Sequence, residues 1–297
     1  MLRKALAVVF CCTSAVWLAA ATDNPASKPQ LTAAEIVRKN VQARGGLQAW
    51  RSVQALTLSG KMGVGGNQRA TLQVPLATGR KPSIGMPVPR PEKETELPFV
   101  MDLARPRKQR FELKFNGQTA IQVYDGANGW KLRPFLNRRD VEPFTAEETK
   151  IASTQADLDG PLVDYEAKGT KIELVGTEKV ENRDTYKVKL TTSAGELLHV
   201  WIDTQTFLEA KIEGQPRRLD GTYHPVEIYY RDYRPVNGIQ IPFVLETRVL
   251  PVAKTATGLR DTPVPPEKIV IDQVMVNPKL DAAEFTKSGI EAAAKVK

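Results

Sequence analysis

Cysteine and histidine are almost absent from this sequence of 297 residues. The two cysteines, Cys11 and Cys12, lie near the N-terminus, and the two histidines are His199 and His224. If the N-terminal stretch is removed, the remaining chain has no cysteine, which excludes disulfides and a thiol nucleophile. The remaining length of about 275 residues is enough to bury a stabilising core without covalent cross-links.

A long apolar run occurs only at the N-terminus, over residues 5–20, where it follows the basic Arg3 and Lys4. Small residues end the run just before Thr22. A basic start, an apolar middle and small residues before a cleavage point are the three parts of a secretory signal. We therefore predict a cleaved signal peptide over residues 1–21 and export to the periplasm.

The same apolar run allows two alternatives, a membrane anchor and a lipidated cysteine. The run has about sixteen residues, whereas a helix that spans a bilayer needs roughly 20. Lipidation requires a small residue just before the modified cysteine, and Phe10 and Cys11 occupy those places. The cleaved signal peptide is the interpretation that the run favours.

Basic residues outnumber acidic residues only slightly. The full chain has 42 Lys and Arg against 34 Asp and Glu, and loss of Arg3 and Lys4 leaves a net charge near +6. The basic residues are scattered, which argues against nucleic acid as a partner. For an exported chain, anionic lipid head groups are the more suitable partner of a mildly basic surface.

Common catalytic motifs are missing. The sequence has no GxSxG elbow, Walker loop or HExxH motif, and the glycine-rich residues 63–66 are predicted to form a hairpin turn. His199 and His224 are far in sequence from other ligand-type residues, so structural roles are favoured for both. We expect a non-catalytic protein without a cofactor, and an enzyme built from scattered carboxylates is the alternative.

One segment partly matches a calcium-binding loop. Asp157, Asp159, Gly160 and Glu166 fit four positions of the pattern D-x-D-x-D-G-x5-E, but Gln155 replaces the first aspartate. A strand-rich sequence follows where the exit helix of such a loop belongs. The segment therefore favours a helix end with an Asp-Gly turn, and no metal site is expected.

Helical signals are few. Thr32 with Glu35, and Thr145 with Glu148, have the spacing of a capping box, which predicts helices that start at Thr32 and Thr145. Residues 22–30 are a polar lead-in that we expect to be flexible. We predict that residues 31–297 form a single domain, with proline-rich insertions at 75–98 and 251–266.

Most of the remaining chain is predicted to be β-strand. In residues 185–191, Tyr186, Val188 and Leu190 alternate with polar residues. One apolar and one polar face indicate an antiparallel sheet that is covered on a single side. The predicted strands, separated by turn signals such as Asn237-Gly238, are 56–62, 68–74, 99–103, 107–115, 119–124, 130–134, 171–176, 185–191, 196–203, 208–213, 225–232, 239–248 and 268–276.

Six segments follow one another in a familiar order: RGGLQAW, VQALTLSGKM, YDGANGW, LDGPLVDYEAKGTKIELVG, WIDTQTFLEAKIEG and DYRPVNGIQIPFVLE. In this order they resemble the bacterial outer-membrane lipoprotein-sorting (LolA-like) proteins over most of residues 31–286, and the chain resembles a larger relative of them. The resemblance implies an α+β, mainly β fold, in which a strongly curved antiparallel sheet, an incomplete β-barrel, is closed by a few helices. It also implies an apolar cavity between sheet and helices that binds acyl chains.

The resemblance further implies an arginine on a strand that latches a helical lid, for which Arg107 and Arg110 are candidates by position. The apolar strand faces are the expected cavity wall, and the alternative is that they only pack against helices and each other. The ten wall residues are Phe111, Leu113, Ile121, Val123, Val188, Leu190, Val200, Ile212, Ile228 and Tyr230.

The expected ligands are therefore acyl chains of lipids or lipoproteins. An inner- or outer-membrane protein is a further expected partner, nucleic acid is not, and the chain is expected to be a monomer. The alternative is an envelope-sensing or protein-interaction module on the same fold, which would use a sheet edge or the proline-rich loops.

Overall fold

The computed structural model describes residues 31–64, 95–134, 138–219, 222–253 and 264–295. The chain divides into two units, Met1–Leu31 and Thr32–Lys297, and the second contains every element described below. The predicted signal peptide, the lead-in at 22–30, the strand at 68–74 and most of both proline-rich insertions lie outside the described residues.

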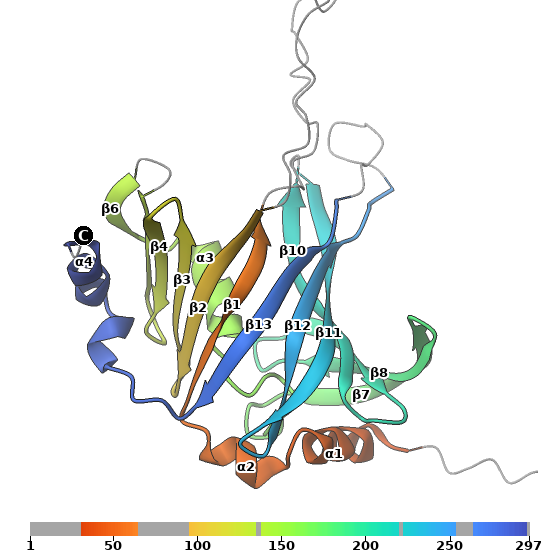
Figure 1. Cartoon of the computed structure of the whole chain (residues 1–297). Helices are drawn as coiled ribbons and strands as arrows, with labels where there is room; N and C mark the ends of the chain where they lie inside the picture. The colour runs from red at the N-terminus through yellow and green to blue at the C-terminus, as the bar shows by residue number, and fades with distance from the viewer. Residues whose placement is uncertain (1–30, 65–94, 135–137, 220–221, 254–263, 296–297) are drawn as a thin grey trace, which may run out of the picture. The chain divides into compact units, whose positions relative to one another are not determined.

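Thirteen strands in the described residues form one antiparallel sheet (Figure 1). The sheet is strongly curved and does not close, which confirms the expected fold class. The strands are β1 (Ala55–Val64), β2 (Thr95–Ala104), β3 (Lys108–Phe115), β4 (Gln118–Tyr124), β5 (Gly129–Arg133), β6 (Arg138–Pro143), β7 (Lys171–Val180), β8 (Arg183–Thr191), β9 (Leu197–Asp203), β10 (Glu209–Leu219), β11 (Thr222–Val236), β12 (Ile239–Val249) and β13 (Glu267–Val276).

Two meanders make up this sheet. Strands β1 to β6 pair in sequence order, strands β7 to β13 do the same, and the pairing of β13 with β1 joins the two meanders. The spatial order is therefore β6-β5-β4-β3-β2-β1-β13-β12-β11-β10-β9-β8-β7. Two differences from the predicted strands stand out: β6 is absent from the prediction, and β2 begins at Thr95, inside the expected proline-rich insertion.

Both capping boxes are confirmed. The helix α1 (Ala33–Ala43) begins after Thr32, and α3 (Ala146–Gln155) begins after Thr145, each with reciprocal bonds between threonine and glutamate. The short helix α2 (Leu47–Ser52) follows α1. Figure 1 shows α1 and α2 at one end of the strands, which we call the closed end. The 3-10 helix η2 (Ala282–Phe285) and α4 (Lys287–Lys295) complete the described chain.

The helices α3 and α4 cover opposite faces of the first meander. Ala152 and Ala156 of the α3 segment pack against Tyr124, whereas Ile290 of α4 packs against Val123. Neighbouring residues on a strand point to opposite faces. We therefore call the face under α3 the inner face and the face under α4 the outer face.

The main core lies on the inner face at the closed end. Trp50 of α2 and Leu158 and Val163 of the following irregular segment pack against the strands, and Trp50 is only 2% exposed. The buried strand residues of this cluster are Leu56, Leu58, Phe99, Leu103, Ile239, Ile241, Phe243 and Ile271. Burial of apolar surface, worth ~25 cal/mol per Å2, therefore fixes α2 and the 158–163 segment to the sheet.

The turn between α1 and α2 depends on a glycine. Gly45 has φ +113°, and a Cβ atom there would lie 2.2 Å from the carbonyl oxygen of Gly238 in the β11–β12 turn. The backbones meet because the amide of Gln240 donates to the carbonyl of Arg44. Only glycine combines this backbone angle with so close an approach.

We expect Gly45→Ala to lower the free energy of unfolding by more than about 2 kcal/mol, because it adds a backbone clash to left-handed strain. Gly117→Ala is the matched control, since Gly117 also has positive φ (+72°) but no atom lies within 4 Å of the position that a Cβ atom would take there. In this control the free energy of unfolding should fall by only about 1 kcal/mol. Chemical denaturation measures both, and equal losses would show that the contact with Gly238 does not matter.

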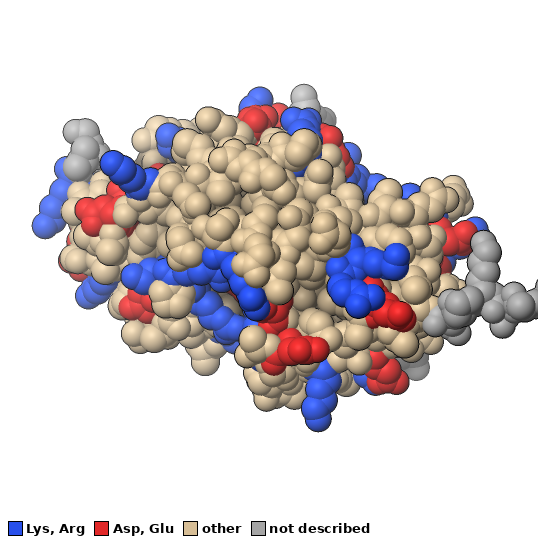
Figure 2. All heavy atoms as spheres, turned by 90° about the horizontal axis from the view of Figure 1, so that it is seen from below, with Lys and Arg blue, Asp and Glu red and all other residues tan. Residues whose placement is uncertain are grey.

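The surface at the closed end has mixed charge. Seen from this end, Lys and Arg side chains are interspersed with Asp and Glu side chains (Figure 2). This agrees with the scattered basic residues of the sequence. The helices in the described parts of the chain are too short or too polar to span a bilayer.

Candidate functional site

Strand register assigns the ten predicted wall residues to faces. Phe111 pairs with Met101, which pairs with Leu58, and this row belongs to the inner-face core. Tyr230 pairs with Leu245, which pairs with Ile269 of the same cluster. Eight of the ten lie on the inner face by this reasoning: Phe111, Leu113, Val188, Leu190, Val200, Ile212, Ile228 and Tyr230.

Ile121 and Val123 lie on the outer face. Their partners across β3 are Glu112 and Arg110, not Phe111. Both are buried in a separate apolar cluster with residues of η2 and α4. These two residues therefore pack against helices and do not share a face with the other eight.

The eight inner-face residues differ in burial. Val188, Leu190 and Val200 are at most 1% exposed, so they have no surface to offer without rearrangement. Phe111, Leu113, Ile212, Ile228 and Tyr230 are half-buried. These five form the accessible apolar part of the predicted wall, and we call them the open wall.

The closed end contains a buried ion pair between α1 and the sheet. Arg44 donates to Glu209 Oε1 at 3.2 Å and to the carbonyl of Asp159 at 3.0 Å, and its guanidinium lies 4.3 Å from the centre of the Trp50 ring. Both side chains of the pair are at most 10% exposed. The Tyr233 hydroxyl also donates to Glu209 Oε2 at 3.1 Å. A buried charge persists only with such partners, so this group fixes α1 against β10 and β11.

The segment that partly matches a calcium loop binds an ammonium group instead. Lys168 Nζ lies 2.9 Å from both carboxylate oxygens of Asp157, 2.7 Å from Asp159 Oδ1 and 2.6 Å from the carbonyl of Gly160. Glu166, the expected final ligand, is exposed and accepts a bond from Tyr165. The oxygens that match the motif are therefore occupied by a lysine of the same loop.

Asp159 connects this loop to the first meander. Its other oxygen accepts from Arg105 Nη2 at 2.6 Å, and Arg105 also donates to the carbonyls of Val53 and Trp50. Burial by itself would raise the pKa of Asp159, but the hydrogen bonds from Lys168 and Arg105 outweigh it and hold that pKa below its ordinary value.

Asp159→Asn is expected to lower the free energy of unfolding by about 3 kcal/mol at pH 7, because two cations lose a buried partner. The folded-state pKa of Asp159 is depressed, so its contribution is present above about pH 4 and is lost as pH falls through the folded-state value. The gap between the wild type and Asp159→Asn should thus shrink in denaturation curves taken from pH 7 to pH 3.

Asp164→Asn is the control in the same loop, since Asp164 pairs with Arg51, whose side chain is 51% exposed. This exposed pair should contribute less than about 1 kcal/mol. Equal losses in the two variants, or a gap that does not change with pH, would contradict the role given to Asp159.

Neither predicted lid arginine acts on the inner face. Arg110 donates to Glu112 and to the carbonyl of Glu284 at 2.8 Å, so it holds η2 against the outer face. Arg107 is exposed and has φ +51°. Two other arginines, Arg44 and Arg105, fix helical and loop segments over the inner face, and both lie outside regular strands.

The two histidines have structural contacts and lie on different strands. His199 Nδ1 is 2.8 Å from Glu213 Oε2, and His224 is fully buried with Nδ1 3.2 Å from the carbonyl of Leu250. Among the described residues, no group of three or more His, Cys, Asp or Glu side chains is arranged to hold a metal ion.

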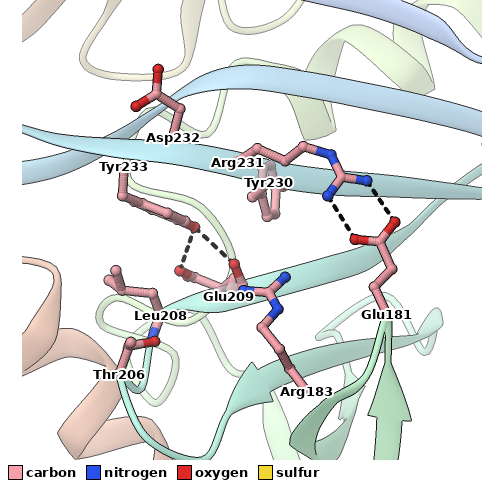
Figure 3. A pocket seen from close by; sticks show the side chains of 9 residues that line it. All are labelled: Glu181, Arg183, Thr206, Leu208, Glu209, Tyr230, Arg231, Asp232 and Tyr233. Carbon is pink, nitrogen blue, oxygen red and sulfur yellow. Dashed lines mark hydrogen bonds and ion pairs between the residues drawn. The ribbon is translucent and has the colours of Figure 1, made fainter.

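A hollow of about 350 Å3 opens where β10 and β11 separate (Figure 3). The two strands pair from their hairpin down to Lys211 opposite Tyr229, and the hollow lies beyond that pair. Figure 3 shows Arg183, the first residue of β8, pointing into it toward Tyr230 and Glu209. The lining residues are Glu181, Arg183, Thr206, Leu208, Glu209, Tyr230, Arg231, Asp232 and Tyr233.

Comparison with solved structures identifies the fold. The chain is similar to a LolA superfamily protein from Nitrosomonas europaea (11% identity, TM-score 0.52), with 88% of this chain and 100% of that chain covered. It is similar to an outer membrane lipoprotein-sorting protein domain from Vibrio parahaemolyticus (8% identity, TM-score 0.50), with 86% and 97% covered. A DUF1329 family protein from Desulfovibrio piger gives 14% identity and a TM-score of 0.50, with 86% and 98% covered.

Comparison of the sequence by itself finds no such similarity. No protein-family model matches it, and no curated protein matches it. The similarity therefore lies in the three-dimensional arrangement, over nearly the whole length of each solved structure. The chain has a LolA-like fold.

Proposed function

We propose that this protein is a non-catalytic carrier that binds acyl chains of lipids or lipoproteins on its inner face. The observation that supports the proposal is the open wall. Its five side chains are apolar or aromatic, lie on one concave face of the curved sheet and are only half-buried. The fold is one in which a solved neighbour is described as an outer membrane lipoprotein-sorting domain.

Burial of apolar surface supplies enough free energy for such binding. Each methylene group that leaves water contributes ~0.8 kcal/mol, so about ten methylenes correspond to ~8 kcal/mol before the cost of association. A total of ~8 kcal/mol corresponds to a dissociation constant of about 1 μM. A site of this type needs a concave apolar surface that excludes water, and it needs no reactive group.

A carrier of lipids or lipoproteins moves its ligand from one membrane to another. The N-terminal signal that we expect would deliver the protein to the periplasm, where an inner- or outer-membrane protein would load or unload it. We propose this localisation and this kind of partner together with the ligand.

Leu113→Trp should lower the affinity for oleate about tenfold or more. Leu113 belongs to the open wall, and the larger side chain takes the space of roughly two or three methylenes. The matched control is Lys114→Trp, which places the same side chain at the next, exposed position on the outer face. Displacement of a fluorescent apolar probe by oleate measures both variants.

Mass spectrometry of an organic extract from natively purified protein should also find co-purified lipid, with less in Leu113→Trp than in the wild type or the control. Wild-type protein that carries no lipid and binds no oleate would refute the proposed function.

A further inference from the structure

The hollow between β10 and β11 has carboxylates that are already bonded. Glu181 accepts bidentate bonds from Arg231 and a further bond from Arg248. These arginine bonds, Arg231 first, lower the pKa of Glu181 to about 2, so it is ionised at neutral pH. Glu209 is bonded to Arg44 and Tyr233, and Asp232 is bonded to Arg234. The acceptors in the lining are therefore engaged with groups of the protein.

Donors in the same hollow remain available. Among the described residues Arg183 has one ion-pair contact, at 3.7 Å to Asp203, and its side chain is 45% exposed. None of the described residues is hydrogen-bonded to the Tyr230 hydroxyl, and burial raises the pKa of this hydroxyl, so it keeps its proton. An arginine and a tyrosine hydroxyl with unused hydrogens match a ligand group that is rich in acceptor oxygens.

The charges around the hollow are balanced before any ligand arrives. Each carboxylate of the lining has an arginine partner within hydrogen-bond distance, and Arg183 faces Asp203 only at a longer distance. An anion bound to Arg183 would therefore meet lining carboxylates that arginines already compensate, while the Asp203 carboxylate keeps the hydrogen bonds from the backbone amides of Gln205 and Thr206. It would exchange a weak contact of Arg183 for charge-assisted hydrogen bonds.

Tyr230 connects the hollow with the open wall. It lines the hollow, and its strand register places it on the inner face, two residues from Ile228. Ile228 in turn lies directly opposite Ile212 on β10. Two residues on a strand span about 7 Å. The neighbouring Arg231 pairs with Val244 on the outer face, so the hollow opens between the two faces and Tyr230 is its inner-face side. A chain that passes Tyr230 can thus continue along β10 and β11 over two half-buried isoleucines.

We propose that the hollow at Arg183 and Tyr230 binds the anionic oxygen head group, a carboxylate or a phosphate, of an amphiphile whose acyl chain lies over Ile228 and Ile212. This inference rests on the proposed function and narrows its ligand class to anionic single-chain lipids and related head groups. Arg183 supplies the charge, and Tyr230 fixes the junction between head group and tail.

The test compares ligands that share a tail and differ in the head group. Oleate, methyl oleate and oleoyl lysophosphatidic acid are titrated against a bound neutral fluorescent probe in the wild type, Arg183→Gln, Arg183→Lys and Tyr230→Phe. Lys179→Gln is the matched control, because it removes an exposed cation of the same hairpin, whose ion-pair partner within the described chain is Asp184. Inorganic phosphate serves as a competitor without a tail.

Arg183→Gln should weaken the binding of an anionic ligand about tenfold and leave the binding of methyl oleate unchanged. Arg183→Lys should lose less affinity for the anionic ligand than Arg183→Gln does. Tyr230→Phe should weaken the binding of the anionic ligand by a smaller factor than Arg183→Gln, and Lys179→Gln should leave the affinity unchanged. A larger loss for lysophosphatidic acid than for oleate identifies phosphate as the preferred head group, and the reverse identifies carboxylate. If inorganic phosphate displaces the probe as effectively as oleoyl lysophosphatidic acid does, the tail contributes nothing to binding. That result would overturn the link between the hollow and the open wall.

Two other results separate the failure of this inference from the failure of the proposed function. If the wild type binds oleate and methyl oleate equally and Arg183→Gln changes neither, the head-group site is wrong and acyl-chain binding stands. If the wild type binds none of the three lipids, the proposed function itself is wrong.

Discussion

The antiparallel pairing of β1 with β13 joins two meanders that would otherwise be separate sheets, each with an exposed apolar face. The pairing contains a register shift between Ser59 and Gly60. A Cβ atom at Gly60 would lie 2.0 Å from the carbonyl oxygen of Val270, so the two strands approach too closely there for any other residue. Such an irregularity strengthens the local twist, which supports the strong curvature of the sheet. Because of this junction, Phe111 of one meander and Tyr230 of the other share one concave face.

Much of the fold follows from local signals in the sequence. Both capping boxes start helices at the expected residue, and the strands from β7 to β13 overlap the predicted ranges because their side chains alternate in polarity. However, β7, β10 and β11 extend three to six residues beyond those ranges. The strand β6, with the sequence RRDVEP, has no alternation of polar and apolar residues and contains proline, so its sequence does not predict a strand. Its place at the edge of the sheet tolerates both features.

The face of each strand is harder to predict than its position. Alternation tells which residues of one strand lie together, but it does not relate one strand to the next. Apolar character alone groups Ile121 and Val123 with Phe111, yet an α4 that the sequence does not reveal gives β4 a second apolar face. The polar side chains that shape the site lie at the ends of elements, such as Arg44 at the end of α1 and Arg183 at the start of β8. Their partners are distant in sequence, so no local pattern identifies them.

Apolar and polar groups occupy different parts of the sheet. The closed end is filled by Trp50, Leu158 and Val163 and fixed by buried ion pairs, while the open wall and the hollow at Arg183 remain accessible. The most direct test of acyl-chain binding on this face is photo-crosslinking with oleate that carries a diazirine near the tail, followed by peptide mapping. We expect the label on inner-face residues, among them Ile228, Ile212 and Phe111. Labelling confined to exposed outer-face residues such as Val270 and Met275 would contradict binding on the inner face.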